Sequence, residues 1–359
     1  MERTIYNQLR EKIDQYSIGM SSSTSGKEIQ ILQILFTEIE ARVYLGMSDR
    51  LESTAAIAKR LGMEAENVVA VLDGMTEKGL TFPKTLDGSK YYAAAPFMHG
   101  FFEHQAYVAN HNKELVQMME DYILDEFKPK YSGMRTVPLN VELNPELPIL
   151  PYDDVKNIIA GKDKIGLIPC ACAYHAEVLG HHSEKPKEVC IVFGFYAEYI
   201  IEEMKAGRWI SQAEALRILD ETEQAGMVHQ TGGNFHSTEV ICNCCADYCA
   251  GLRMIKALKR PARAVFSNYY AELDGDLCSG CEICLDRCPM EAISSGQETI
   301  MIDRQRCIGC GLCTSACPVE AISLCVKPEG LQPPPEDYLF MRSTADMEKE
   351  LAGQVKKLD

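Results

Sequence analysis

The sequence has no long apolar run and no secretion signal. Its N-terminal stretch, MERTIYNQLREKIDQYS, lacks the basic, apolar and small-residue segments of a signal peptide. No later stretch has the ~18 or more uncharged apolar residues that a membrane-spanning helix requires. We therefore expect a cytoplasmic protein with no membrane partner.

The sequence is also short of positive charge. It has 36 lysines and arginines against 52 aspartates and glutamates, so its net charge is −16. Such a chain repels nucleic-acid phosphates and anionic membrane surfaces, and it favours a partner with a basic docking face. No G-x-G-x-x-G or Walker-type loop occurs, so the sequence indicates no dinucleotide or nucleoside triphosphate site, and nothing supports flavin binding.

Cysteine, by contrast, is abundant, with 16 residues in a chain of 359. A reducing cytoplasm keeps thiols from pairing, so clustered cysteines there are more often metal ligands than disulfides. Eight of them form two copies of the spacing C-x2-C-x2-C-x3-C-P inside an internal repeat. The first copy contains Cys278, Cys281, Cys284 and Cys288, and the second contains Cys307, Cys310, Cys313 and Cys317.

This spacing predicts two [4Fe-4S] clusters that exchange their fourth ligands. Three thiolates of one tight loop bind three irons of a cubane, and the fourth iron takes its thiolate from the other repeat. The first cluster therefore adds Cys317 to the first loop, and the second cluster adds Cys288 to the second loop. Zinc is the alternative, but it usually takes two separated C-x2-C pairs.

At these residues the sequence resembles the two-cluster bacterial ferredoxins, over residues 273–326. The resemblance implies a ferredoxin-like fold of βαβ type. It also implies outer-sphere transfer of single electrons at low potential. No departure from the cysteine pattern of that family is visible.

Seven further cysteines lie in the middle of the chain: Cys170, Cys172, Cys190, Cys242, Cys244, Cys245 and Cys249. Our leading interpretation is a third [4Fe-4S] cluster in a four-thiolate cage, with zinc as the alternative, because thiolates suit both. Redox-active thiols or a substrate-binding disulfide also remain open. Residues 149–326 resemble an architecture of anaerobic bacteria and archaea, described as 4Fe-4S binding proteins, in which C-x-C, a lone cysteine and CNCC precede the ferredoxin. That resemblance implies the cofactor but no substrate.

The N-terminal part has the pattern of a winged helix. Residues 27–46 predict one amphipathic helix, a helix-turn-helix pattern with its turn at Gly62 follows, and Asp87-Gly88 indicates a hairpin. The helix that would enter a DNA groove is acidic, with Glu64 and Glu66 at its start, and carboxylates repel phosphates. Nucleic acid is therefore not the expected partner, and we favour a docking module or a homodimer contact.

Together these patterns predict an α+β chain with an N-terminal winged helix, a mostly helical α/β cysteine-rich middle domain and a C-terminal ferredoxin-like domain with two [4Fe-4S] clusters. The expected segments are a winged-helix-like domain at 1–130, a proline-rich linker at 131–150, the middle domain at 151–265, the ferredoxin domain at 266–327 and a proline-rich, helical tail at 328–359.

The favoured function is an iron-sulfur electron-transfer protein that serves a larger anaerobic oxidoreductase complex as a subunit or partner. Two alternatives remain: a redox-sensing winged-helix transcription regulator, and an oxidoreductase with a catalytic cluster in its middle domain. The sequence assigns no catalytic residue.

Overall fold

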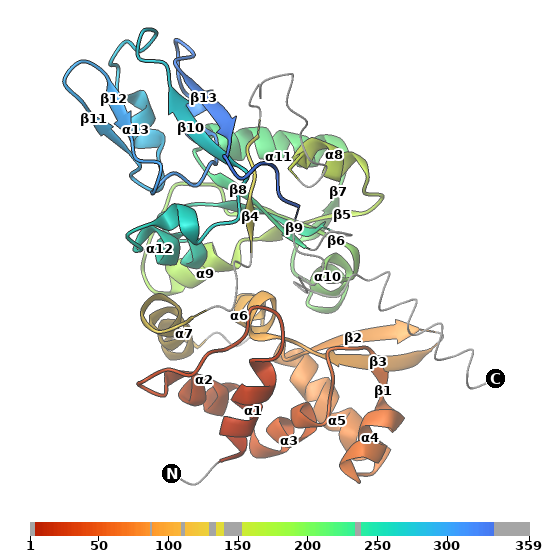
Figure 1. Cartoon of the computed structure of the whole chain (residues 1–359). Coiled ribbons are helices and arrows are strands. Elements are labelled where there is room, and N and C mark those ends of the chain that lie inside the picture. Colours follow the sequence, from red (N-terminus) through yellow and green to blue (C-terminus); the bar gives the residue numbers. More distant parts are fainter. Residues whose placement is uncertain are drawn as a thin grey trace.

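A computed structural model describes residues 4–86, 88–108, 112–128, 134–139, 153–233 and 238–333. The N-terminal helices lie at one end of the molecule, a sheet with flanking helices forms the middle, and the C-terminal module lies at the other end (Figure 1). The fold is a mixture of helices and sheets, as the sequence predicts. No helix in the described ranges is long and apolar enough to cross a membrane.

Three short helices open the chain: α1 (Ile5–Ile13), α2 (Lys27–Leu35) and α3 (Glu38–Leu45). The prediction of one helix over residues 27–46 is wrong, because the chain breaks at Phe36 and restarts at Thr37. The Thr37 side chain accepts a hydrogen bond from the Glu40 backbone, while the Glu40 carboxylate accepts one from the Thr37 backbone. This reciprocal cap stabilises a new helix start.

The next elements occur in the order that the winged-helix interpretation expects. They are β1 (Glu52–Ser53), α4 (Thr54–Leu61), α5 (Ala65–Glu77), β2 (Thr81–Leu86) and β3 (Ser89–Ala94). The strands form an antiparallel sheet of order β1-β3-β2. Gly62 ends α4 with a φ of 64°, a left-handed conformation that suits glycine. Asp87, in the predicted hairpin turn, lies outside the described residues, and the winged-helix assignment stays a prediction.

A second group of helices joins this part to the middle of the chain. A wide turn at Phe97–Phe101 leads into α6 (Phe102–His104), and α7 (Lys113–Asp125) follows. Helix α7 packs on α2 and also contacts α9 and α12 of the middle region. The N-terminal helices therefore cover one side of the cysteine-rich region (Figure 1).

The middle region is built around a sheet, which corrects the prediction of a mostly helical domain. Six strands pair antiparallel in the order β4-β8-β9-β6-β5-β7. They are β4 (Arg135–Thr136), β5 (Ile165–Pro169), β6 (Glu188–Phe193), β7 (Arg208–Ile210), β8 (Val228–Gly233) and β9 (Thr238–Cys244). Several of these strands are short or polar, so their sequences lack the long alternation that identifies a strand.

Helices cover the sheet and connect its strands. They are α8 (Val155–Ala160), α9 (Ala171–Val178), α10 (Gly194–Glu198) with a π-helical turn at Tyr199–Glu203, α11 (Gln212–Gln224), α12 (Ala250–Lys256) and a short 3-10 turn at Pro261–Arg263. Helix α11 begins at the capping residue Ser211, as the sequence predicts. It ends at Gln224, beside the C-terminal module.

Part of the segment predicted as a linker belongs to the sheet. Strand β4 pairs with β8, and Arg135 forms a buried ion pair with Asp153. The Arg135 guanidinium also donates to the Gln332 carbonyl at 3.0 Å, which anchors the start of the predicted tail. Most of residues 131–150 and the tail from 334 lie outside the described residues, and the predicted domain boundaries stay predictions.

The C-terminal module repeats one unit twice. The first copy contains β10 (Tyr269–Leu273), α13 (Ile283–Arg287) and β11 (Ile293–Ser295), and the second contains β12 (Ile300–Ile302), α14 (Leu312–Ser315) and β13 (Ile322–Val326). Strand β10 pairs with β13, and β11 pairs with β12, so each copy exchanges strands with the other. Helices α13 and α14 pack together at the centre of the module.

Candidate iron-sulfur sites

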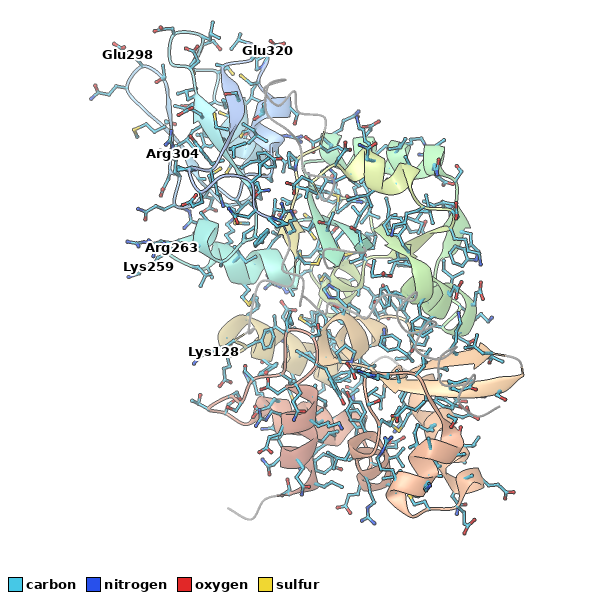
Figure 2. All side chains as sticks on the ribbon, turned by 45° about the vertical axis from the view of Figure 1, so that its right-hand side comes forward. Lys128, Lys259, Arg263, Glu298, Arg304 and Glu320 are labelled. Carbon is cyan, nitrogen blue, oxygen red and sulfur yellow. The ribbon has the colours of Figure 1, made fainter. Side chains whose placement is uncertain are left out.

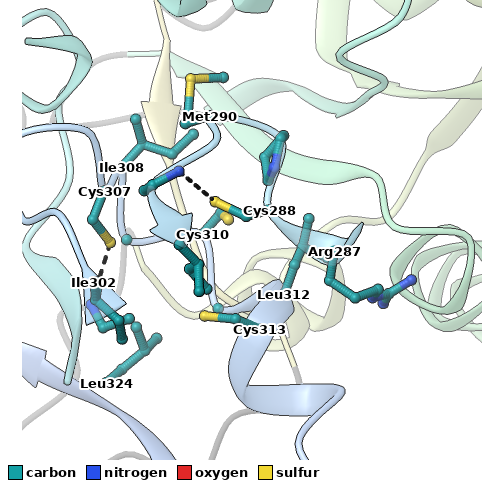
Figure 3. Close-up of a pocket in the computed structure, with 16 residues that line it drawn as sticks. Arg287, Cys288, Met290, Ile302, Cys307, Ile308, Cys310, Leu312, Cys313 and Leu324 are labelled. Atoms are coloured by element: carbon teal, nitrogen blue, oxygen red, sulfur yellow. Dashed lines mark hydrogen bonds between the residues drawn. The ribbon is translucent and has the colours of Figure 1, made fainter. Parts of the chain in front are cut away.

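The fold brings the eight repeat cysteines together in two groups of four. Site one contains Cys278, Cys281 and Cys284 of the first loop with Cys317 of the second repeat, and these four line one pocket. Site two contains Cys307, Cys310, Cys313 and Cys288, which line a second pocket (Figure 3). Each group combines three cysteines of one loop with one of the other, the arrangement that the sequence predicts.

Both pockets have apolar walls and few polar groups. Site one is walled by Ile300 and Ile322, and site two by Ile302 and Leu324, so each takes one apolar side chain from β12 and one from β13. In Figure 3 the Arg287 side chain points away from site two. It donates instead to the Glu223 and Gln224 carbonyls at the end of α11. Such walls exclude water from a cluster and influence its potential.

Backbone N–H groups donate to cysteine sulfurs in both repeats. Ala292 N donates to Cys288 Sγ at 3.2 Å, and Ala321 N donates to Cys317 Sγ at the same distance. Ala271 N donates to Cys307 Sγ at 3.3 Å. Hydrogen bonds to thiolate ligands stabilise the more negative charge of a reduced cluster, so these contacts are suited to setting its potential.

One loop glycine is required by close packing. Gly309 has a φ of 68°, and a Cβ added there would lie 2.2 Å from the Tyr269 carbonyl oxygen. Only glycine fits a left-handed position with a backbone so near. The Gly309 loop is therefore held against β10, which places Cys307 and Cys310 beside Cys288.

The two sites differ in their exposure to solvent. Cys281 of site one is exposed, whereas Cys307, Cys310 and Cys313 of site two are buried. Cys284 and Cys313 interact electrostatically, which shows that the sites are neighbours. Site one therefore lies toward the outer surface of the module, and site two lies toward the middle region.

The middle region brings six thiols into a closed ring. Cys170 interacts with Cys172 and Cys190, and Cys190 interacts with Cys242. Cys242 interacts with Cys244, Cys244 with Cys249, and Cys249 with Cys172, which closes the ring. We call these six residues the thiol ring: Cys170, Cys172, Cys190, Cys242, Cys244 and Cys249.

Sheet topology explains how distant positions form the thiol ring. Cys190 lies on β6, which pairs on one side with β5 and on the other with β9. Cys170 directly follows β5, and Cys242 and Cys244 lie on β9. The other two thiols come from helix starts, since Cys172 lies in the first turn of α9 and Cys249 caps α12.

The environment of the thiol ring favours negative charge at two of its members. Contacts with neighbouring thiols, first that of Cys190, lower the pKa of Cys242 to about 5. Contact with Cys172 lowers the pKa of Cys249 well below its usual value, and the Leu252 N–H adds to this effect. The contact with Cys172 raises the pKa of Cys170 to about 12. Thiolates are the form that binds metal.

Cys245 does not join the ring, although the sequence grouped it with the other six. Its thiol donates to the Asp247 carboxylate at 3.2 Å. Cys325 likewise stands apart from both ferredoxin sites and donates to Glu272. No three His, Cys, Asp or Glu side chains in the described parts of the chain are arranged to hold a single metal ion.

A large cavity adjoins the thiol ring. Its volume is about 650 Å³, and all six ring cysteines line it together with residues of the N-terminal helices. On the same measure, sites one and two each leave about 20 Å³. The ring cavity is therefore far larger than a site shaped for one cubane.

An acidic and an imidazole side chain line this cavity. Glu103 accepts a hydrogen bond from Gly100 N at 2.8 Å, and burial raises the pKa of its carboxyl to about 8. Burial lowers the pKa of His99 to about 3. At neutral pH both groups are therefore mainly uncharged.

A buried hydrogen-bond chain links the ferredoxin module to the thiol ring. Ser315 Oγ, on α14, donates to Glu223 at 2.5 Å, and His229 Nε2 lies 3.0 Å from the other Glu223 oxygen. His229 Nδ1 lies 2.6 Å from the Asn243 side chain, which donates to the Val189 carbonyl at 2.6 Å. Asn243 separates Cys242 from Cys244, so the chain ends inside the ring motif.

One apolar cluster also joins the sites. It contains Cys244 and Cys249 of the thiol ring, cysteines of both ferredoxin sites, and packing residues between them such as Val228 and Leu252. Val228 pairs with Cys244 across β8 and β9. The three cysteine groups are therefore parts of one packed core.

Residues 271–324 match the family model of the 4Fe-4S dicluster domain. The match covers the repeat region and supports iron-sulfur cluster binding by a ferredoxin-type domain. The chain has no match among the curated proteins or the solved structures. The comparisons thus define the C-terminal module, and the middle and N-terminal regions are interpreted from their own residues.

The sequence interpretation missed several polar residues of these sites. Asn243 lies between Cys242 and Cys244 in the CNCC motif, so its position was a signal that it belongs to the site. Glu223 and His229 carry no local pattern, because their partners come from α14 and β9. Glu103 lies in the N-terminal part, where nothing in the sequence indicated a cofactor site.

Proposed function

We propose that the chain is an iron-sulfur electron-transfer protein with three metal centres, serving a larger redox complex as a subunit or partner. The two ferredoxin sites would each hold a [4Fe-4S] cluster, and the thiol ring would hold the third centre. When bound, such clusters supply one-electron transfer. The observation that carries the proposal is the shared apolar core, which includes cysteines of all three sites.

The thiol ring suits an iron-sulfur cluster better than a zinc ion. A structural zinc ion takes four ligands at a tetrahedral point, whereas the ring offers six thiols around a space. Four of its thiols are buried and two are half-buried, and the Ala173, Ala250 and Leu252 N–H groups donate to ring thiols. Buried N–H donors of this kind stabilise an anionic cluster.

The exposed face at site one supports docking of a redox partner. Leu277, Ile283 and Val319 are 54%, 46% and 40% exposed beside the site-one cysteines. Acidic side chains surround them, and Figure 2 shows Glu298 and Glu320 at the outer end of the module. An apolar centre with an acidic rim fits a partner that has a basic docking face.

Charge pairing supports a docking role for the N-terminal domain over DNA binding. Lys59, Arg60, Lys84 and Lys90 would be its phosphate contacts. Three of these four cations, Arg60, Lys84 and Lys90, form ion pairs with Glu52, Glu198 and Asp73. A paired cation gains little from a phosphate. Ile34 and Ile39, each 42% exposed, give α2 and α3 an apolar surface for a homodimer or a partner.

An oxidoreductase with its active site at the thiol ring is the second candidate function. The cavity of about 650 Å³ favours it, because a centre that only relays electrons needs no such space. Glu103 faces this cavity as a protonated acid at neutral pH, a state that can donate a proton.

The proposal is tested by a redox titration of the anaerobic protein, followed by electron paramagnetic resonance. We expect a third reducible centre in addition to the two ferredoxin clusters. The double variant Cys190→Ala/Cys242→Ala should lose this centre and keep the other two. Cys245→Ala is the matched control, because its thiol lies outside the ring. A wild-type protein with only two centres would refute the third.

A further inference from the structure

We propose that the cavity beside the thiol ring binds a small organic anion with an apolar body. Its anionic group would lie at a cationic mouth, and its body would lie against the ring. The inference deepens the proposed function, on which it rests for a metal centre at the ring. The binding site itself is argued from the cavity.

The first step is the volume. The two ferredoxin sites show that this fold leaves about 20 Å³ at a group of four cysteines. The ring cavity has about 650 Å³. The difference is large enough for a small organic molecule in addition to a cluster, since ligand sites in proteins commonly measure roughly 300–1,000 Å³.

The second step is the chemistry of the wall. Most of the lining is apolar, with aromatic and thioether side chains from both the N-terminal and the middle regions. They include Met98, Phe102, Phe127, Met134, Met254 and Phe266. Methionine adapts to irregular shapes, and aromatic rings supply a large contact area. Such a wall binds an aliphatic or aromatic body.

The third step is the charge at the mouth. Lys128 and Arg263 line the cavity and are exposed, and neither side chain forms an ion pair with any described residue. Figure 2 shows Lys128, Lys259 and Arg263 along one edge of the molecule. Two such cations lining one cavity attract an anionic group locally, although the chain as a whole has a net charge of −16.

The fourth step is the acidic group on the wall. Glu103 lines the cavity, and its carboxylate accepts a hydrogen bond from Gly100 N at 2.8 Å. The anionic group of the ligand would therefore bind at the exposed cations rather than beside this carboxylate.

The test is calorimetric titration of the anaerobic, cluster-loaded protein with octanoate, and separately with the uncharged octanol. We expect octanoate to bind with one site per chain and more tightly than octanol. The Arg263→Gln variant should weaken octanoate binding by roughly fivefold, the change in Kd that corresponds to about 1 kcal/mol. Lys259→Gln removes the same charge from a residue that does not line the cavity, so it should leave the affinity unchanged.

A second variant tests the cavity itself. A Cβ at Gly251 would meet only Cys249 Sγ, at 3.9 Å, so Gly251→Leu places a side chain in open space beside the ring. Octanoate binding should fall at least tenfold, while the circular dichroism spectrum stays unchanged. The proposal is overturned by absent octanoate binding, by octanol binding equally well, or by equal effects of Arg263→Gln and Lys259→Gln.

The same samples separate this inference from the proposed function. Iron content and the spectrum of the reduced ring centre report the metal centre, and they should not change in Arg263→Gln. Octanoate binding that depends on Arg263 in a protein without a ring centre would refute the third centre and support the binding site. A ring centre in a protein that does not bind octanoate would support the third centre and refute the binding site.

Discussion

The two cysteine-rich regions use thiols in different ways. Each ferredoxin site takes three cysteines from one loop and a fourth from the other repeat, and its cavity has about 20 Å³. The thiol ring takes its six cysteines from three neighbouring strands and two helix starts, and it borders a cavity of about 650 Å³. The first geometry leaves little free volume, whereas the second borders a large cavity.

The difference indicates separate tasks within one core. Site one reaches the surface through Cys281, site two is buried, and the thiol ring shares an apolar cluster with both. The ferredoxin sites are thus suited to passing electrons, and under our proposals the ring would hold a centre that receives them beside a ligand. Four predictions test whether the two regions differ in this way.

The largest expected effect concerns the exchanged ligands. Cys317→Ala should remove the cluster at site one, and Cys313→Ala should remove the cluster at site two, although both residues belong to the second repeat. Each variant should lose about four irons, the content of one cubane. Iron analysis and resonance spectra of the reduced protein measure this. Loss of the same cluster in both variants would show that each repeat binds its cluster alone.

The next effect concerns the hydrogen-bond chain between the two regions. His229→Leu leaves Glu223 and Asn243 buried without a shared partner. Breaking a buried charged network commonly costs about 3 kcal/mol of unfolding free energy. Chemical unfolding under anaerobic conditions measures it. His181→Leu, at an exposed histidine, is the control and should change the free energy by less than about 0.5 kcal/mol.

A smaller effect is acid sensitivity at the junction of the N-terminal and middle regions. His104 is buried against Phe82, Tyr196 and Tyr199, and burial lowers its pKa from 6.5 to about 4. The unfolded chain binds the proton more readily, so stability falls as pH drops from 6.5 toward 4. At pH 5 the loss is about 2 kcal/mol.

His104→Phe should remove this part of the pH dependence. Thermal unfolding at pH 7.5 and at pH 5, followed by aromatic circular dichroism, should show a smaller difference in the variant than in the wild type. An equal difference in the two proteins would show that His104 is not the source of this pH dependence.

The smallest effect is at the surface of the same junction. Lys84 forms an ion pair with Glu198 at 2.5 Å, which joins β2 to α10. Both side chains are partly exposed, so Lys84→Ala should lower the unfolding free energy by less than about 1 kcal/mol. High salt should reduce the difference from the wild type, as measured by chemical unfolding at two ionic strengths. A loss that is independent of salt would indicate packing rather than charge.

How much the sequence could predict differs between the two regions for a physical reason. The ferredoxin ligand groups follow from local spacing, because a tight loop fixes where Cys307, Cys310 and Cys313 lie. The thiol ring depends on strand order, since Cys170, Cys190 and Cys242 meet only because β6 lies between β5 and β9. The sequence identified all six ring residues as candidates but not their number, and it grouped Cys245 with them.

The other differences have similar causes. The break at Thr37 follows a local capping box that the apolar periodicity of residues 27–46 concealed. Strand β4 was assigned to a linker because two residues are too short to show a strand pattern, and their strand conformation depends on pairing with β8. Glu103 and His229 face partners that are distant in sequence, so no window of sequence could indicate them.

The central claim is that the thiol ring holds a cluster in addition to the two ferredoxin clusters. Iron and acid-labile sulfide analysis of the anaerobically purified wild-type protein tests it most directly. The account predicts clearly more than about eight of each per chain, the content of two cubanes. A value of about eight, unchanged in Cys190→Ala/Cys242→Ala, would contradict it.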